Sequence, residues 1–164
     1  MTQPELRRLF TAGLYEMNWF ENAWIKILGQ FIRADNFTNI ATTLKKERAW
    51  SQEHVNRIRV IFNSLEEPLE RMQSRTSSGL IADLAAASSL AAKNDFESDV
   101  SLLLTIIKAT NYQIGAYSGI LELASAMQYD YIEGLLVDTI SEEKQTILTL
   151  TKLLSEYIQA AETA

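Results

Sequence analysis

Apolar residues recur at the spacing i, i+3, i+4, i+7 in four long stretches of the chain, a pattern typical of helices with one buried face. The stretches cover about residues 4–33, 36–66, 95–127 and 130–161. The chain contains only two prolines and six glycines. Since both residue types interrupt helices, their scarcity favours continuous helical segments. The pattern therefore predicts an all-α protein with four long helices.

The lengths of the connections predict how these helices are arranged. The links "ADN" and "MQYDY" are short, and short links join antiparallel neighbours. The link over residues 67–94 is long, and its stretch "SSGLIADLAAASSLAAK" predicts a shorter fifth helix. A helix of about 30 residues is about 45 Å long, a distance that this link can cross to return the third helix parallel to the second. We expect a ferritin-like antiparallel four-helix bundle with a long crossover, in one domain over residues 1–164.

Composition narrows the partners that this bundle could have. The 164 residues carry a formal net charge of −6, with no basic run longer than Lys45–Lys46, so nucleic acid and anionic membranes are not expected partners. The absence of cysteine excludes disulfides, thiolate catalysis and cysteine-bound metals. No apolar run is as long as a membrane span, and the first residues lack a signal-peptide core, so we expect a cytoplasmic protein.

Polar residues interrupt the apolar stripe near the middle of each predicted long helix. A projection at about 100° per residue places acids or the single histidine there in the first, second and fourth helices, and Thr110 with Asn111 in the third. The candidate metal ligands are Glu21, Glu47, His54 and Glu143. In a bundle these interruptions form one layer, and buried carboxylates are costly unless they are hydrogen-bonded, paired or metal-bound.

The ligand set is too small for the usual di-metal site of such bundles. That site takes a Glu from two helices and Glu-x-x-His from the other two, about six ligands. The motif does not occur in this sequence, and the third helix adds no acid to the layer. We therefore predict no di-iron centre and, as the alternative to a protein without cofactor, one weakly held iron, manganese or zinc ion.

Each candidate also has an ordinary structural interpretation. His54 could be a ligand or a helix-flank histidine bonded to a neighbour. Glu21 and Glu143 could be buried acids that hydroxyl groups or a basic residue satisfy. The residues available for this are Thr110, Thr139, Tyr117 and Arg48. No nucleophile or pocket-forming loop accompanies the carboxylates, so we do not expect an enzyme.

Several stretches in order along the chain match a known family. They are "LRRLFTAGLYEMNWFENAWIKIL", "HVNRIRVIF", "SGLIADL", "NYQIGAYSGILELA" and "LLVDTISEEKQT". With these stretches the chain resembles the YciE/YciF family of ferritin-like, stress-associated bacterial proteins. The resemblance implies an antiparallel bundle with a short crossover helix, commonly dimeric, and a suspected di-metal centre.

By this resemblance, the chain retains only part of the family's metal centre. The family's Glu on the first helix matches Glu21, and its Glu-Glu-Lys on the fourth matches Glu142 to Lys144. On the second helix three family positions fall at Glu47, Trp50 and His54, so that Trp50 would fill the room of a metal. On the other helices the family's remaining ligands are replaced by Thr110, Asn111, Gln113 and Ile147. The resemblance thus implies a retained scaffold with a degenerate metal centre.

Three aromatic residues lie away from the predicted core stripes. Tyr15 and Trp19 are one turn apart on the first helix, and Tyr112 is placed similarly on the third. Exposed aromatic residues on a helix usually mark an interface or a surface that another element covers. We expect a homodimer, with cover by the crossover helix as the alternative.

Two hypotheses of function follow. The first is a non-catalytic bundle protein of a stress-associated family, with a degenerate di-metal centre, that acts through self-association or another partner. The alternative is a metal-binding ferritin-like oxidoreductase or iron-handling protein with a reduced ligand set. Nothing in the sequence indicates a small-molecule ligand.

Overall fold

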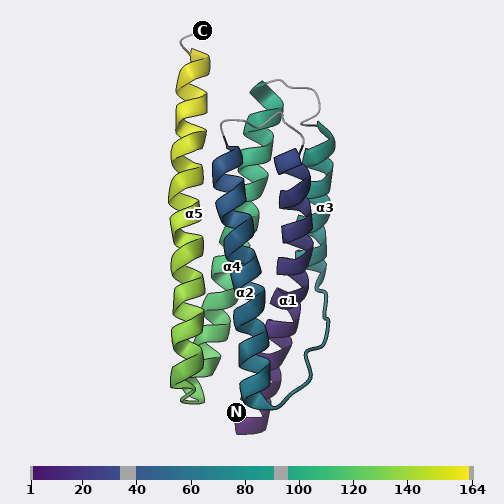
Figure 1. Ribbon diagram of the computed structural model, residues 1–164, viewed down its shortest axis with the longest axis vertical. Coiled ribbons are helices and arrows are strands. Elements are labelled where there is room, and N and C mark those ends of the chain that lie inside the picture. Colours follow the sequence, from purple (N-terminus) through teal and green to yellow (C-terminus); the bar gives the residue numbers. More distant parts are fainter. Residues whose placement is uncertain (1, 34–39, 91–95, 163–164) are drawn as a thin grey trace.

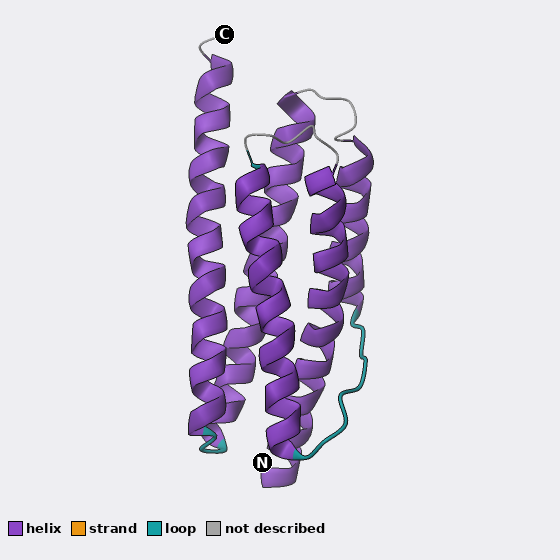
Figure 2. Ribbon diagram, in the orientation of Figure 1, coloured by secondary structure: helices purple, strands orange, loops and turns teal. Residues whose placement is uncertain are grey.

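The computed structural model describes residues 2–33, 40–90 and 96–162 and contains five helices in these ranges. The helices are α1 (Gln3–Arg33), α2 (Ala41–Leu65), α3 (Arg75–Leu90), α4 (Phe96–Ala126) and α5 (Asp130–Glu162). These described ranges contain no strand, and each helix in them is too short or too polar to cross a bilayer. The predicted all-α class is confirmed (Figure 2). The predicted start of the second helix at residue 36 falls outside the described residues, and α2 begins at Ala41.

The four long helices lie side by side along the long axis of the molecule, and the shorter α3 lies beside them (Figure 1). Helix α1 packs against α2 and α4, and α5 packs against the same two helices. Helix α3 packs against α1 and α4 and so covers the groove between them. Because the 66–74 segment and α3 lead the chain back along the molecule, α4 runs in the same direction as α2 (Figure 1).

The segment that follows α2 is fixed by a left-handed helix cap and by contacts with α1. Glu66 adopts φ 55°, and the backbone N–H of Glu67 donates to the carbonyl of Phe62 at 3.2 Å, which satisfies the end of α2. Arg7 Nε then donates to Glu67 Oε1 at 2.6 Å. Before α3, the backbone N–H of Ser77 donates to the Ser74 hydroxyl at 3.0 Å, a helix-capping contact. These contacts hold the crossover against α1.

The core is apolar at both ends and polar in the middle. The largest fully buried side chains are aromatic: Phe10, Phe20, Trp24, Phe31, Phe62 and Tyr117. Gly13 lets α1 and α4 approach closely, because a Cβ atom there would lie 2.9 Å from Ile120 Cγ1. Among these apolar layers lie acids and amides that are as inaccessible as the aromatic residues.

Candidate polar centre in the bundle core

Helical spacing places one polar side chain from each long helix at the same height. Glu21 follows Met17 by one turn on the buried face of α1, His54 follows Glu47 by two turns on α2, and Glu143 follows Thr139 by one turn on α5. All four predicted ligands are buried, with exposed fractions of 2% or less. The sequence prediction of a buried polar layer therefore agrees with their positions.

His54 lies at the middle of this layer and contacts three carboxyl groups. Its Nδ1 atom lies 3.1 Å from Glu21 Oε1 and 3.3 Å from Glu143 Oε1. Its Nε2 atom lies 2.9 Å from Glu142 Oε2. Both ring nitrogens thus face carboxyl oxygens, so the site favours an imidazolium ring that donates from both sides.

Helix α4 completes the centre with an amide and a phenol. Gln113 Nε2 donates to Glu21 Oε1 at 3.2 Å and to Glu143 Oε1 at 3.1 Å. Tyr117 donates to Glu21 Oε1 at 2.8 Å. The prediction that Asn111 belongs to the layer is wrong, since Asn111 is exposed and bonds to the carbonyl of Ile107.

Thr110 is buried, but its hydroxyl donates to the carbonyl of Ile106 on its own helix. Three hydroxyl groups were available to satisfy the acids, and the hydroxyl of Tyr117 is the one that bonds to an acid of the centre. Gln113, which the resemblance placed at a replaced ligand position, follows Thr110 and precedes Tyr117 at helical spacing and lies in the layer.

Glu47 lies apart from the group around His54. Its Oε1 atom accepts from Trp24 Nε1 at 3.1 Å, and its Oε2 atom accepts from the Thr146 hydroxyl at 2.6 Å. In the described part of the chain, the atoms close enough to share one metal ion come from Glu21, His54 and Glu143, within 4.8 Å of one another. The predicted set of four ligands is therefore reduced to three.

An ion pair at the edge of the layer connects the centre to the surface. Arg57 donates to both oxygens of Glu142, from Nη1 at 2.6 Å and from Nη2 at 2.9 Å, and its Nη1 atom also donates to the Thr139 hydroxyl at 3.1 Å. Arg48, one of the residues available to satisfy the buried acids, does not bond to them. Its Nε atom donates to the carbonyl of Ile25.

Burial and neighbouring charges set the protonation of these groups. Burial and the charges of Glu47, Glu21 and Glu142 raise the pKa of Glu143 well above its usual value, and burial also raises the pKa of Glu47. Burial lowers the pKa of His54, but the charge of Glu21 and hydrogen bonds to Glu142 and Glu21 outweigh it and raise that pKa to about 9. Burial raises the pKa of Glu142, but its bonds to Arg57 and His54 lower it to about 2.

The residues present do not fit a di-metal centre. Helix α4 contributes Gln113 and Tyr117, and neither an amide nor a neutral phenol replaces the carboxylates that such a centre requires. The resemblance implied that Trp50 fills the space of a metal, but Trp50 does not lie in that space. It is half-buried outside the core cluster, with the amine of Lys46 4.2 Å from the centre of its ring.

Three buried oxygens of the centre nevertheless lack a hydrogen bond to any described residue: Glu21 Oε2, Glu143 Oε2 and Gln113 Oε1. Two of them belong to residues that also approach His54 Nδ1. The three residues Glu21, His54 and Glu143 therefore fit one ion better than two.

The predicted interface aromatics contact the chain's own crossover. Tyr15 stacks on Phe62, with ring centroids 4.9 Å apart, and donates to the carbonyl of Pro68 at 3.1 Å. Tyr112 donates to Glu16 at 2.5 Å, and Glu16 also accepts from Ser74. Trp19 is half-buried between α1 and α3. The crossover supplies the cover that we gave as the alternative, and an interface with a second copy at these residues stays a prediction.

Comparison with known proteins gives a family and two similar structures. The family described as "Domain of unknown function (DUF892)" matches residues 5–163. The stress protein YciF of E. coli superposes with a TM-score of 0.85 at 22% identity, over 94% of this chain and 97% of that one. The protein YcfI of Rhodopseudomonas palustris superposes with a TM-score of 0.80 at 20% identity, over 89% and 92% of the two chains. No curated protein matches the sequence.

Proposed function

The chain belongs to the DUF892 family of YciF-like proteins, and we propose that it is a non-catalytic, stress-associated protein of the cytoplasm with a ferritin-like antiparallel four-helix bundle and a degenerate metal centre. In this proposal the polar centre stabilises one packing of the helices. The protein's role then resides in its surface, through self-association or another partner.

The observation that carries the proposal is the placement of His54 between carboxyl groups on both sides. A metal-binding histidine must present an unprotonated nitrogen to the ion. Here Nδ1 and Nε2 lie 3.1 Å and 2.9 Å from the oxygens of Glu21 and Glu142. Such a ring takes the place of a cation among the acids, so folding does not depend on a metal.

The chain's single histidine allows a direct test by nitrogen NMR. The two ring nitrogens of His54 should show the shifts of an imidazolium at pH 7 in protein that has been dialysed against a chelator. Denatured protein at the same pH supplies the reference for a free ring. A neutral ring with one unprotonated nitrogen at pH 7 would overturn the proposal.

A second candidate is a metal-binding ferritin-like oxidoreductase or iron-handling protein that holds one ion. It is favoured by the unpartnered oxygens of Glu21 and Glu143 beside His54 Nδ1. With Nε2 donating to Glu142, the arrangement is that of a histidine whose orientation a carboxylate fixes. An ion must displace the Nδ1 proton, which at pH 7 weakens binding by a factor of about 100 if the pKa is about 9.

Elemental analysis of protein purified without a histidine tag separates the two candidates. We expect less than one equivalent of iron, manganese or zinc after dialysis against a chelator. His54→Gln is the matched control for any ion that remains. About two iron or manganese ions per chain, retained after the dialysis, would contradict the degenerate centre altogether.

Self-association is supported by large apolar side chains that α5 leaves exposed. Tyr131, Val137 and Leu148 are 65%, 51% and 72% exposed. Light scattering tests the proposed homodimer, and a monomer at all concentrations would rule it out. Replacing Tyr15 and Trp19 together by alanine should lower the association state only if these residues also contact a second copy.

A further inference from the structure

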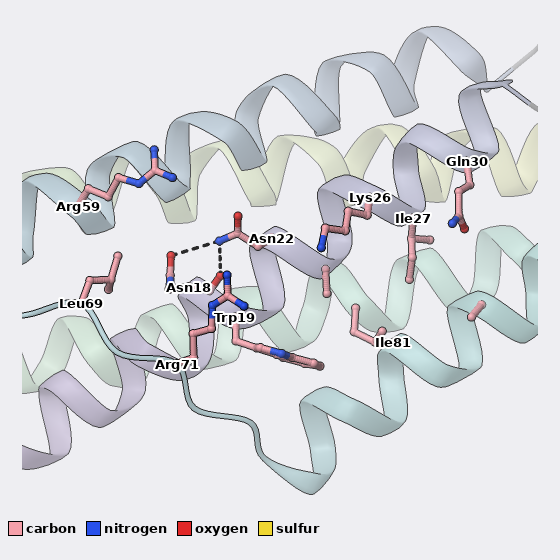
Figure 3. Close-up of a pocket in the computed structure, with 12 residues that line it drawn as sticks. Asn18, Trp19, Asn22, Lys26, Ile27, Gln30, Arg59, Leu69, Arg71 and Ile81 are labelled. Carbon is pink, nitrogen blue, oxygen red and sulfur yellow. Dashed lines mark hydrogen bonds between the residues drawn. The ribbon is translucent and has the colours of Figure 1, made fainter.

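A groove separates α1 from the crossover on the side of the molecule away from α5. It has a volume of about 640 Å³, and its walls come from α1, α3, the segment after α2 and one residue of α2 (Figure 3). This volume lies within the range of small-molecule sites. None of the residues of the polar centre lines it.

The lining of the groove is basic, although the protein is acidic. Lys26 of α1, Arg59 of α2 and Arg71 of the crossover line it, and the described lining contains no acidic residue, in a chain with 21 acidic and 15 basic residues. Among the described ion pairs, none involves these three side chains. Three like charges without counter-charges in one concave surface attract an anion.

Two of the three basic side chains, those of Lys26 and Arg71, are directed into the groove. In Figure 3 the amine of Lys26 and the guanidinium of Arg71 both extend toward the Asn22 side chain. Arg59 Nη1 donates to Asn56 at 3.3 Å, so the guanidinium at this end is partly fixed. An anion in the middle of the groove could therefore approach charges from α1 and from the crossover at once.

The rest of the lining supplies an aromatic platform and fixed amides. Trp19 is half-buried and lies between α1 and α3, with Ile27 and Ile81 also in the wall. Asn22 Nδ2 donates to the backbone carbonyl of Asn18 at 2.7 Å and to its side-chain oxygen at 3.2 Å, which orients both amides. An indole beside guanidinium and ammonium groups suits a ligand that has both a ring and negative charge.

We propose that this groove binds a small organic anion that carries at least two negative charges, on phosphate or carboxylate groups, and a planar ring that packs on Trp19. Lys26 and Arg71 bind the charged end, and Trp19 binds the ring. This site is separate from the polar centre, so the proposal does not depend on the state of His54.

The test is a titration of the full chain with four probes. ADP and benzene-1,2,4-tricarboxylate represent the phosphate and carboxylate forms of the ligand, while pyrophosphate lacks the ring and adenosine lacks the charge. Calorimetry measures affinity, and tryptophan emission reports on the ring. We expect at least one of the two ring anions to saturate the protein and to bind more tightly than pyrophosphate or adenosine.

Variants locate the binding. Lys26→Ala with Arg71→Ala removes two exposed charges and should lower the affinity for the ring anion by about tenfold or more. Lys45→Ala with Lys108→Ala is the matched control, because both residues are exposed and outside the groove, and it should leave the affinity unchanged. Trp19→Leu should lower the affinity for the ring anion without changing the affinity for pyrophosphate.

Three results would overturn the inference. The first is the absence of saturation by either ring anion at millimolar concentration. The second is equal weakening by both pairs of charge variants, which would indicate a general effect of net charge. The third is pyrophosphate binding as tightly as the ring anions, which would remove the role of Trp19. Far-UV circular dichroism of each variant establishes that the fold is retained.

Discussion

The polar layer has two parts that are equally buried but neutralised differently. Around His54, acids from α1 and α5 surround a ring that donates from both nitrogens. Among the described residues no cation forms an ion pair with Glu47, and its carboxyl group is held by Trp24 and Thr146. The proposed imidazolium makes the first part ionic, whereas in the second part burial raises the pKa of Glu47 against the hydrogen bonds from Thr146 and Trp24.

The difference follows from access to the surface. His54 bonds to Glu142, which is partly exposed and paired with Arg57, so charge is distributed from the core to the solvent. Glu47 bonds to residues that are themselves buried. A charged group is tolerated in the core where a chain of partners spreads its charge, and a neutral group is favoured where such a chain is lacking.

Removal of the imidazolium of His54 should lower the free energy of unfolding more than any other change in the two parts of the layer. His54→Leu leaves the buried Glu21 without a cation, and we expect the free energy of unfolding at pH 7 to fall by about 3–5 kcal/mol. Chemical denaturation measures this. Glu47→Gln is the control, because an amide can accept from Trp24 and donate to Thr146, and it should cost less than about 1 kcal/mol. Equal losses in the two variants would show that the two parts do not differ.

The ionic part should also give stability a characteristic dependence on pH. The pKa of His54 is raised from 6.5 to about 9, so its contribution is complete below pH 6.5 and is lost as pH rises through 9. The shift corresponds to about 3 kcal/mol between pH 6.5 and 10. Denaturation at a series of pH values measures the loss, and His54→Gln should show a much smaller one in this window.

At low pH the stability depends on pH in the opposite direction, because Glu142 is an acid whose pKa is lowered. The pKa of Glu142 is lowered to about 2, so its contribution is present above the usual pKa of a glutamate and is lost as pH falls through about 2. A stability curve without loss on the alkaline side would contradict an imidazolium at His54, whereas the loss at low pH reports on Glu142 with both of its cationic partners, Arg57 and His54.

Glu21 should contribute more to the free energy of unfolding than Glu143, its neighbour on α5. Its Oε1 atom accepts from Tyr117, His54 and Gln113, so three donors converge on one oxygen. Glu21→Gln keeps the shape but removes the negative partner of His54, and we expect a loss of about 1–3 kcal/mol in denaturation at pH 7. The Nδ1 resonance of His54 should shift as well, and an unchanged resonance would assign the counter-charge to another acid.

The fold was predictable because it depends on repeated local signals. Apolar spacing predicted the helices that became α1, α4 and α5 within one or two residues of their described ends, and the stretch "SSGLIADLAAASSLAAK" in the 67–94 link predicted α3. Each helix carries many apolar positions, so an error at one position does not alter the pattern. The three acids and the histidine also stood out, because each interrupts an apolar stripe.

The partners of these residues were less predictable. Arg48 and Arg57 are nine residues apart on α2, which is about two and a half turns, so they lie on opposite flanks of the helix. One flank faces α1 and the other faces α5, and a single sequence does not say which flank faces which neighbour. The position of Gln113 came from the resemblance and not from the apolar pattern, since a neutral amide near the stripe of α4 resembles an ordinary surface residue.

The smallest expected effect is that of Glu143→Gln, and it tests whether this acid is neutral. Gln113 donates to Glu143 Oε1, which an amide oxygen can replace, and Glu143 Oε2 has no partner among the described residues, so an NH₂ group there breaks no bond. Because burial and neighbouring acids raise the pKa of Glu143, the folded protein holds this proton more tightly than an unfolded chain at pH 7, and the variant removes that advantage of the unfolded state. We therefore expect no loss beyond about 0.5 kcal/mol at pH 7, or a gain that disappears near pH 4. Paired denaturation curves at the two pH values measure the difference. A loss of about 2 kcal/mol at pH 7 would instead mean that Glu143 is ionised and provides a counter-charge of His54, which would make the ionic part of the layer larger than Glu21 and Glu142 alone.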